Sequence, residues 1–396
     1  MVTYVALLML LQLGVAPAVA TFLSALLFVP WVLKSFMRLW VSRVGDLRPM
    51  LHFIEALLSV CLLFLAFAFN QGSVLVFIAL MLVSLLCAWH ELAARMYYQQ
   101  TLRPSVLRLL TNSKLVVSQV VVIFTYGALI FLVGTLEVYF RQIRYSWSLA
   151  SYVAAGLFML FAFLHLLTLA PSKRQMPIAI KAIGGRKHRS VIAWKSFLFL
   201  FLLLLPQGLM FHVRVLYLFD AHAHGGLQCT MQEIGFAQGT VGVIAFSIGI
   251  ALGRWFFTRM DNGKWTMDNY QLPKFMLMAL SIVLSPFVYL GMTIWPPQTL
   301  FELCCCTMLA QLLFGLGLGV CRLPISAISG IRYRNTINML QIPLVSAAMF
   351  VPMAISGWLV EQLGYNTYFL VNALSAPICL LGIFLLRTGD KWGNNS

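Results

Sequence analysis

The sequence predicts an all-α integral membrane protein with twelve membrane-spanning helices arranged as two sets of six. Three observations predict this class. Of the 396 residues, 61% are hydrophobic and only 10% are charged, and the mean hydropathy is +0.90. Helix-length apolar runs follow one another almost without interruption, and Lys and Arg are concentrated in every second gap between them. A water-soluble domain of this length needs far more polar surface, which excludes the soluble classes.

A helix that crosses about 30 Å of hydrocarbon needs roughly 20 apolar residues. Applied gap by gap, this rule predicts first-half spans at residues 1–14, 17–39, 52–70, 73–95, 113–138 and 146–170. It predicts second-half spans at residues 194–217, 233–257, 272–294, 299–323, 336–359 and 366–387. The first span is short, so either its helix begins at the membrane surface or the true start of the protein lies upstream of Met1.

The basic residues predict the orientation. Lys and Arg number 27, and all but Arg141, Arg144 and Arg214 fall in alternate gaps or in the C-terminal tail. Because basic residues are retained on the cytoplasmic side, we expect a multi-pass protein of the cell inner (cytoplasmic) membrane with both termini in the cytoplasm. The net charge of +16 is then explained by topology and by contact with anionic membrane lipids. Basic residues scattered over short gaps do not favour nucleic-acid binding.

The longest predicted cytoplasmic gap divides the chain into two halves. We expect an N-terminal six-helix bundle at residues 1–170, a linker at 171–193, and a C-terminal bundle with a short tail at 194–396. Matching short, basic gaps at 38–48 and 254–264 favour an internal duplication, which is typical of secondary transporters. The alternative is that any chain with twelve spans divides numerically into halves.

One of these gaps carries a family resemblance. Residues 38–50 (RLWVSRVGDLRPM) resemble the major facilitator signature G-x-x-x-D-[RK]-x-G-[RK]-[RK], with Arg43 and Gly45 in matching places and Ser42 where the acid is usual. The pattern of Gly357, Gly364 and residues 365–369 also resembles the turn between the last two facilitator spans. The resemblance implies the major facilitator fold and alternating access, and it assigns Arg43 and Gly45 to gating.

Shorter elements resemble a narrower branch, the AmpG-type muropeptide permeases and their acetyl-CoA transporter relatives. They are residues 30–36 (PWVLKSF), 232–235 (QEIG) and 333–336 (YRNT). Where that branch carries Q-D-x-x-x-D in span four, this chain has His90, Glu91 and Arg95, so a base replaces the second acid. The resemblance implies import of a muropeptide, an anhydro-sugar peptide.

Ionisable residues inside predicted spans are costly in a bilayer and indicate function. Lys34 and Glu91 lie at similar depths in two antiparallel spans, which predicts an ion pair. The alternative is that Lys34 reaches the headgroups alone and Glu91 pairs with Arg95 one turn along its helix. Glu91 is the first candidate for proton coupling, with His90 and Glu55 beside it, and Arg95 is assigned to gating. The sequence favours a purely structural role for His165.

Span seven contains Pro206, Gly208 and Arg214. Proline removes a helical hydrogen bond and glycine loosens the backbone, so we expect a gating kink there. Arg214 is a candidate to bind a substrate carboxylate or phosphate, and the alternative is that it reaches the outer headgroups. With Lys34, the polar residues expected to line the substrate site are Tyr126, Gln311, Asn338 and Gln341. Such amides also hold helices together.

The sequence predicts no cofactor and no metal site, because no phosphate loop, nucleophile elbow or H-E-x-x-H motif is present. Asp220, His222 and His224 alternate in a Gly-rich loop, which is a weak metal signal. We therefore expect a monomeric, non-enzymatic secondary transporter, coupled to protons, for a small amphiphilic or anionic solute. The alternatives are a transporter for another amphiphile (drug efflux, siderophore or CoA ester), a non-transporting sensor derived from a facilitator, and an intramembrane enzyme.

Overall fold

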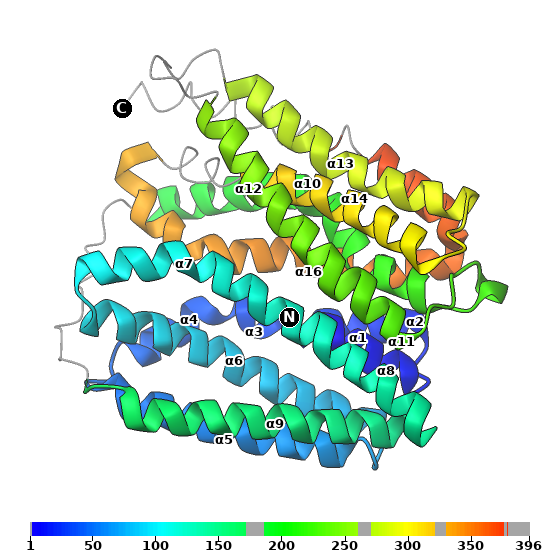
Figure 1. The fold of residues 1–396 in the computed structure, drawn as a ribbon. Coiled ribbons are helices and arrows are strands. Elements are labelled where there is room, and N and C mark those ends of the chain that lie inside the picture. The colour runs from blue at the N-terminus through cyan, green and yellow to red at the C-terminus, as the bar shows by residue number, and fades with distance from the viewer. Residues whose placement is uncertain (1, 172–185, 260–270, 321–329, 376–377, 379–396) are drawn as a thin grey trace.

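The computed structural model describes residues 2–171, 186–259, 271–320, 330–375 and 378. Over these residues the chain is a bundle of long helices that run side by side, with no strand (Figure 1). The helices of the first half and those of the second half gather on opposite sides of the molecule (Figure 1). The structure therefore has the two-part, all-α architecture that the sequence predicts.

The first half begins with a short helix and a broken one. Its elements are α1 (Val2–Gln12), α2 (Pro17–Leu26), α3 (Val29–Val32), α4 (Lys34–Val41), α5 (Leu47–Ala68), α6 (Ser73–Thr101), α7 (Pro104–Val122), η1 (Ile123–Ala128), α8 (Leu129–Phe140) and α9 (Ile143–Thr168). The predicted span at 17–39 matches the apolar segment Pro17–Arg38, which is long enough to cross a membrane but is not one unbroken helix. The chain there makes three helices, because the tighter i→i+3 bonds from Trp31 N to Phe28 O and from Phe36 N to Leu33 O interrupt the helical ladder around Pro30.

The second half is built in the same manner. Its elements are α10 (Arg186–Phe219), η2 (His222–His224), α11 (Met231–Ile234), η3 (Gly235–Gly242), α12 (Val243–Arg259), α13 (Gln271–Ile294), α14 (Leu300–Val320) and α16 (Gly330–Leu374). Helix α10 begins at Arg186, inside the predicted linker at 171–193. Helix α16 joins two predicted spans across Gly364, whose φ of 71° only glycine adopts readily.

By length and apolar composition, nine helices of the described chain are able to cross a membrane. Two shorter apolar helices, Thr3–Gln12 and Leu284–Ile294, account for two further predicted spans. The predicted last span, 366–387, begins after the bend at Gly364, and most of it lies outside the described residues. The helices of the described chain thus agree with the predicted twelve-span plan.

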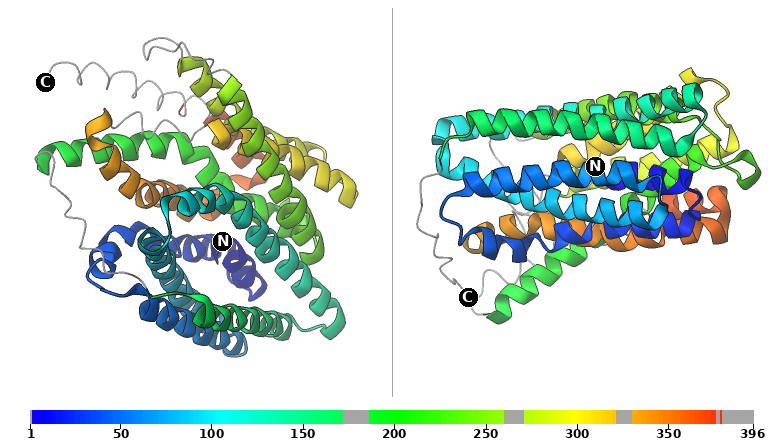
Figure 2. Two further views of the ribbon diagram at one scale, coloured as in Figure 1. Left: turned by 60° about the vertical axis from the view of Figure 1, so that its left-hand side comes forward. Right: turned by 90° about the horizontal axis from the view of Figure 1, so that it is seen from below.

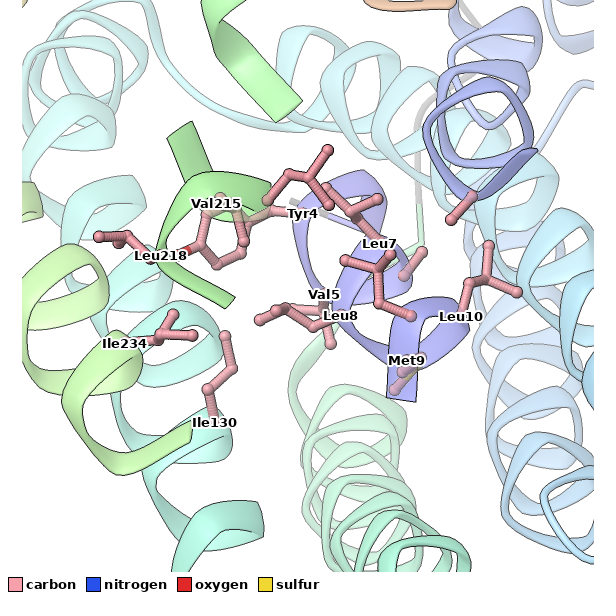
Figure 3. Packing of buried hydrophobic residues seen from close by; sticks show 14 of the residues in the cluster. Tyr4, Val5, Leu7, Leu8, Met9, Leu10, Ile130, Val215, Leu218 and Ile234 are labelled. Carbon is pink, nitrogen blue, oxygen red and sulfur yellow. The ribbon is translucent and has the colours of Figure 1, made fainter. Parts of the chain in front are cut away.

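Helix α1 is enclosed by both halves of the molecule. Its side chains from Thr3 to Leu11 are all buried, and Figure 3 shows Tyr4, Leu8 and their neighbours facing Ile130 of α8, Val215 of α10 and Ile234 of α11. A helix of this length spans only about 16 Å, roughly half of the hydrocarbon thickness. Apolar packing on every side therefore holds α1 inside the protein, where it brings Tyr4 to the contact between the two halves.

Two pairs of elements join the halves at one end of the molecule. Helix α2 packs on α16, and the π-helical segment η1 with α8 packs on α11 and η3. Glycines permit the close approach: a side chain on Gly239 would overlap the carbonyl of Tyr126, and one on Gly357 would overlap Thr21. This end carries the turns at 13–16 and 141–142, so the orientation predicted from the basic residues makes it the outer end (Figure 2).

Candidate substrate and proton sites

Arg214 lies inside the protein on α10, between the fully buried Val213 and Val215. Its guanidinium carbon is 5.1 Å from the ring centre of Phe211. The Nε atom is buried without a hydrogen-bond partner, and in the described part of the chain no carboxylate pairs with the side chain. A cation enclosed in this way does not extend to the headgroups, so the structure favours the inward-facing alternative for Arg214 over the snorkelling one.

Three tyrosines lie within electrostatic range of Arg214. Tyr4 of α1 and Tyr126 of η1 come from the first half, and Tyr289 of α13 comes from the second. The rings of Tyr4 and Tyr126 are stacked with their centres 4.2 Å apart. The Tyr4 hydroxyl is buried and has no hydrogen-bond partner. Polar groups of both halves therefore gather around one half-buried cation.

Two glutamines extend this group from the second half. The Gln238 side-chain amide donates to the Tyr289 hydroxyl at 2.7 Å, and the Gln311 amide donates to Gln238 Oε1 at 3.1 Å. Both glutamines are buried. We call the six residues the inter-bundle cluster: Tyr4, Tyr126, Arg214, Gln238, Tyr289 and Gln311.

The sequence predicted half of the inter-bundle cluster. Tyr126, Arg214 and Gln311 were candidate substrate residues, whereas Tyr4, Gln238 and Tyr289 were not. A polar side chain inside an apolar span, the signal that indicated Gln311, was also present for Gln238. The other two predicted substrate residues on α16, Asn338 and Gln341, have side chains that fall outside the described structure.

A second charged group lies in the first half, where α6 faces the break in the second span. Lys34 Nζ is 2.6 Å from Glu91 Oε2, which confirms the predicted contact. Arg95 Nη2 is 3.2 Å from Glu91 Oε1, so the contact of the alternative forms as well. Lys34 also lies 4.7 Å above the ring of Trp31. One carboxylate thus faces two cations. Lys34, a predicted substrate residue, belongs to this charged group and is not a member of the inter-bundle cluster.

Glu55 is the centre of a third group, on three helices of the first half. Its Oε1 atom is 3.0 Å from His90 Nε2 of α6 and 2.6 Å from His165 Nδ1 of α9. His52, one turn earlier on α5, has Nδ1 3.8 Å from Oε2. The Glu55 side chain is 3% exposed, so this carboxylate lies inside the protein. His165 contacts Glu55 although 110 residues separate them in the chain. The apolar sequence around His165 did not predict this contact.

The residues assigned to gating lie in two places. Arg43 and Gly45 are in the exposed turn between α4 and α5, and space around Gly45 is open. Pro206 lies within α10, and its carbonyl accepts a hydrogen bond from the Asn372 amide at 3.2 Å. A side chain on Gly208 would meet Pro352 of α16, so this glycine permits close packing of α10 on α16.

The loop with alternating Asp and His is held by its own hydrogen bonds. His224 Nδ1 is 3.0 Å from Asp220 Oδ1, and His222 Nδ1 is 3.0 Å from the Gly226 carbonyl oxygen. The Tyr365 hydroxyl donates to Asp220 Oδ2 at 3.0 Å. Among the described residues there is no group of three or more His, Cys, Asp or Glu arranged to hold a metal ion.

Comparison with known proteins identifies the fold. No protein-family model and no curated protein sequence matches the chain. A bacterial homologue of the human lysosomal transporter Spinster, in an inward-facing and occupied conformation, has a TM-score of 0.69 at 12% identity over 98% of this chain and 92% of its own. The nucleoside transporter NupG has a TM-score of 0.64 at 13% identity over 98% and 94%.

A D-xylose–proton symporter has a TM-score of 0.66 at 15% identity and covers 97% of this chain and 92% of its own. Identities this low establish the fold alone. The AmpG-type branch has no counterpart among these structures. With its helices paired as described above, the chain has the fold of the major facilitator transporters.

Proposed function

We propose that this protein is a secondary active transporter of the cell inner membrane that moves a small amphiphilic or anionic solute by alternating access. The observation that carries the proposal is the position of Arg214. A half-buried cation whose buried Nε atom has no partner, and which pairs with no carboxylate of the described chain, costs free energy unless a ligand compensates it. It lies where both halves meet, and in transporters built from repeats the substrate binds at that contact.

Alternating access requires the two halves to move relative to each other. The contacts that join them at one end, α2 with α16 and η1 with η3, are made by glycines, Thr21 and Pro17, with few charged groups. Such flat contacts separate without leaving buried charges unpaired. Pro206, which removes one helical hydrogen bond, and the tight packing of Gly208 then make α10 the helix that transmits this movement to Arg214.

We assign proton coupling to the Glu55 group. Glu91, the first candidate from the sequence, is less suited to this role. Glu91 is held by two cations, Lys34 and Arg95, and its protonation would leave both of them uncompensated. Glu55 lies within hydrogen-bond distance of His90 and His165, and carboxylate and imidazole side chains can both hold a proton. A proton can therefore move between the carboxylate and the imidazoles with little change in the bonds around them.

The first solute to test is a muropeptide, on the strength of the sequence elements at 30–36, 232–235 and 333–336. This assignment rests on those elements and not on the inter-bundle cluster, which supplies a single cation to face one carboxylate. The other candidates remain another amphiphile, namely a drug, a siderophore or a CoA ester, and a sensor that binds solute without moving it. We also propose that both termini lie in the cytoplasm, that the protein works as a monomer, and that the linker spans residues 171–193.

The deciding experiment is uptake of labelled GlcNAc-anhydroMurNAc-peptide into proteoliposomes with and without an inward proton gradient. We expect accumulation that depends on the gradient and is abolished by a protonophore. The matched control is Arg144→Gln, which removes an exposed arginine from α9. Lack of uptake by a folded preparation contradicts the muropeptide assignment. Uptake that is the same with and without the proton gradient contradicts proton coupling.

A further inference from the structure

We infer that the solute recognised by the inter-bundle cluster is a small monoanion with an aromatic or apolar body. This inference rests on the proposed transport function and specifies its substrate class. It follows from the count of charges in the cluster, from the direction of its hydrogen bonds, and from the rings that surround Arg214.

The charge count allows one negative charge. Arg214 is the only charged member of the six-residue cluster, and no acid pairs with it in the described chain. A single half-buried cation compensates one anionic group, whereas a second anionic group brought into the same place would have no cation to face. A cationic solute would meet like charge without an acid to offset it. The cluster therefore selects against dianions and against cationic amphiphiles.

The hydrogen bonds of the cluster leave donors available for a solute. Tyr289 accepts from the Gln238 amide, so its own hydroxyl hydrogen is directed elsewhere. The buried Tyr4 hydroxyl and Arg214 Nε have no partner within the described protein. Three donors from both halves are thus available, and buried donors of this kind are normally satisfied. A carboxylate, with two acceptor oxygens, satisfies a guanidinium and a phenol together.

Aromatic rings lie beside the Tyr4 and Arg214 donors. Arg214 lies over Phe211, and the Tyr4 and Tyr126 rings are stacked. Phe211 in turn packs edge-on against Phe28 of the other half, with ring centres 6.3 Å apart. An aromatic or apolar body next to the carboxylate would pack on such rings, whereas a sugar, with many hydroxyls, would leave most of its hydrogen bonds unmade.

A matched series of ligands that share one ring tests the charge rule on the purified full-length protein. The probes are phenylacetate, phenylacetamide, 2-phenylethylamine and phenylmalonate, which carry one negative charge, no charge, one positive charge and two negative charges. Binding is measured by calorimetric titration and by the rise in unfolding temperature. We expect saturable binding of phenylacetate and at least tenfold weaker binding of the other three. Equal binding of the amide or the amine, or no binding of phenylacetate, overturns the inference.

Variants locate the site. We expect Arg214→Gln to weaken phenylacetate binding at least tenfold and Arg214→Lys to restore part of it, because lysine keeps the charge but loses the planar fork. Tyr4→Phe should weaken binding several-fold without a change in the preference for one charge. Arg144→Gln, the same chemical change at an exposed site, should bind as the parent protein does. Unchanged binding by Arg214→Gln rejects the site.

The outcomes separate this inference from the proposed function. If phenylacetate binds at Arg214 but no labelled solute is taken up under any gradient, the substrate class stands and the protein is a sensor rather than a transporter. If uptake of the muropeptide or of a neutral solute is driven by the gradient and persists in Arg214→Gln, transport stands and the monoanion assignment is wrong.

Discussion

The ammonium of Lys34 and the carboxylate of Glu91 lie 2.6 Å apart, although 57 residues separate them in the chain. The contact exists because the second span breaks after α3, which places Lys34 at the start of α4 beside α6. Glu91 is shared, because Arg95 approaches its other oxygen. The pair therefore ties a broken helix to an unbroken one within the first half.

Neutralising one partner of this pair should cost stability. We expect Lys34→Gln and Glu91→Gln each to lower the free energy of unfolding by about 1–3 kcal/mol, less than for a fully buried pair because Glu91 is 28% exposed on its side chain. Lys34→Gln should also reduce transport, and the double variant should recover part of the loss. The measurement is thermal unfolding in detergent, analysed as a double-mutant cycle. Strictly additive losses would show that the pair carries no coupling energy.

The exposed partner provides the comparison for that cycle. Arg95 is 45% exposed, and ion pairs at exposed positions contribute at most about 1 kcal/mol. Arg95→Gln should therefore lower the unfolding temperature less than Lys34→Gln does. A larger effect for Arg95→Gln would assign the main interaction of Glu91 to its own helix.

Glu55 should be needed for coupling but not for movement of the solute. With Glu55→Gln we expect gradient-driven accumulation to be lost while exchange of labelled for unlabelled solute continues, because the amide cannot carry a proton between His90 and His165. Uptake and exchange assays in the same proteoliposomes measure both. Glu302→Gln, which changes an exposed acid of α14, is the control. Accumulation at the parental level by Glu55→Gln would remove this group from the coupling mechanism.

Gly239→Ala should prevent the close contact of η3 with η1. The added methyl group would overlap the backbone carbonyl of Tyr126, and backbone atoms cannot move aside as easily as the end of a flexible side chain. We expect a loss of about 1–3 kcal/mol of stability and a strong loss of transport. Gly156→Ala on α9 is the matched control, because space around Gly156 is open and alanine favours the helix. Parental transport by Gly239→Ala would show that this contact is not made during the cycle.

Glu361 should hold the two halves together where α2 meets α16. Its Oε1 atom accepts a hydrogen bond of 2.9 Å from the backbone N–H of Ala18, in the first turn of a helix that has no side-chain cap of its own. A carboxylate at a helix N-terminus contributes about 0.3–1 kcal/mol. Glu361→Gln should therefore shift the equilibrium about two- to fivefold towards separation at this end.

Distances between spin labels at Gln71 and Trp295, exposed positions of the two halves, measure this shift in a cysteine-free background. The control is Glu302→Gln, because Glu302 accepts from the backbone of Gln298 within the same half. The same distance distribution in the parent and in Glu361→Gln would show that the hydrogen bond does not hold the halves together.

Cys229, in the loop before α11, should react slowly with thiol reagents. Burial and the nearby Glu233 carboxylate raise the pKa of the Cys229 thiol to about 12, so only a minute fraction is thiolate at neutral pH. The labelling rate should rise about tenfold for each pH unit between about 7 and 10. Maleimide labelling of a variant that retains Cys229 alone tests this. A rate that levels off below pH 9 would place the pKa near its ordinary value.

The sequence by itself determined the membrane class, the positions of most helices and the division into halves. These properties are local, because the cost of placing charges and unpaired backbone groups in hydrocarbon is set by each segment's own composition. The contact between Lys34 and Glu91 could also be predicted from the sequence, because the depth of each residue in its span can be counted along the chain. The composition of single segments did not predict the kind of solute.

Only the tertiary structure decided which polar residues meet. His165 contacts Glu55 because α9 packs on α5, and Tyr4 comes within electrostatic range of Arg214 because apolar packing encloses a short α1 between the halves. The break after Leu26 depended on the balance of local hydrogen bonds around Pro30, which hydropathy does not report. Contacts between distant segments arise from helix packing, and the periodicity of a single span carries no information about its neighbours.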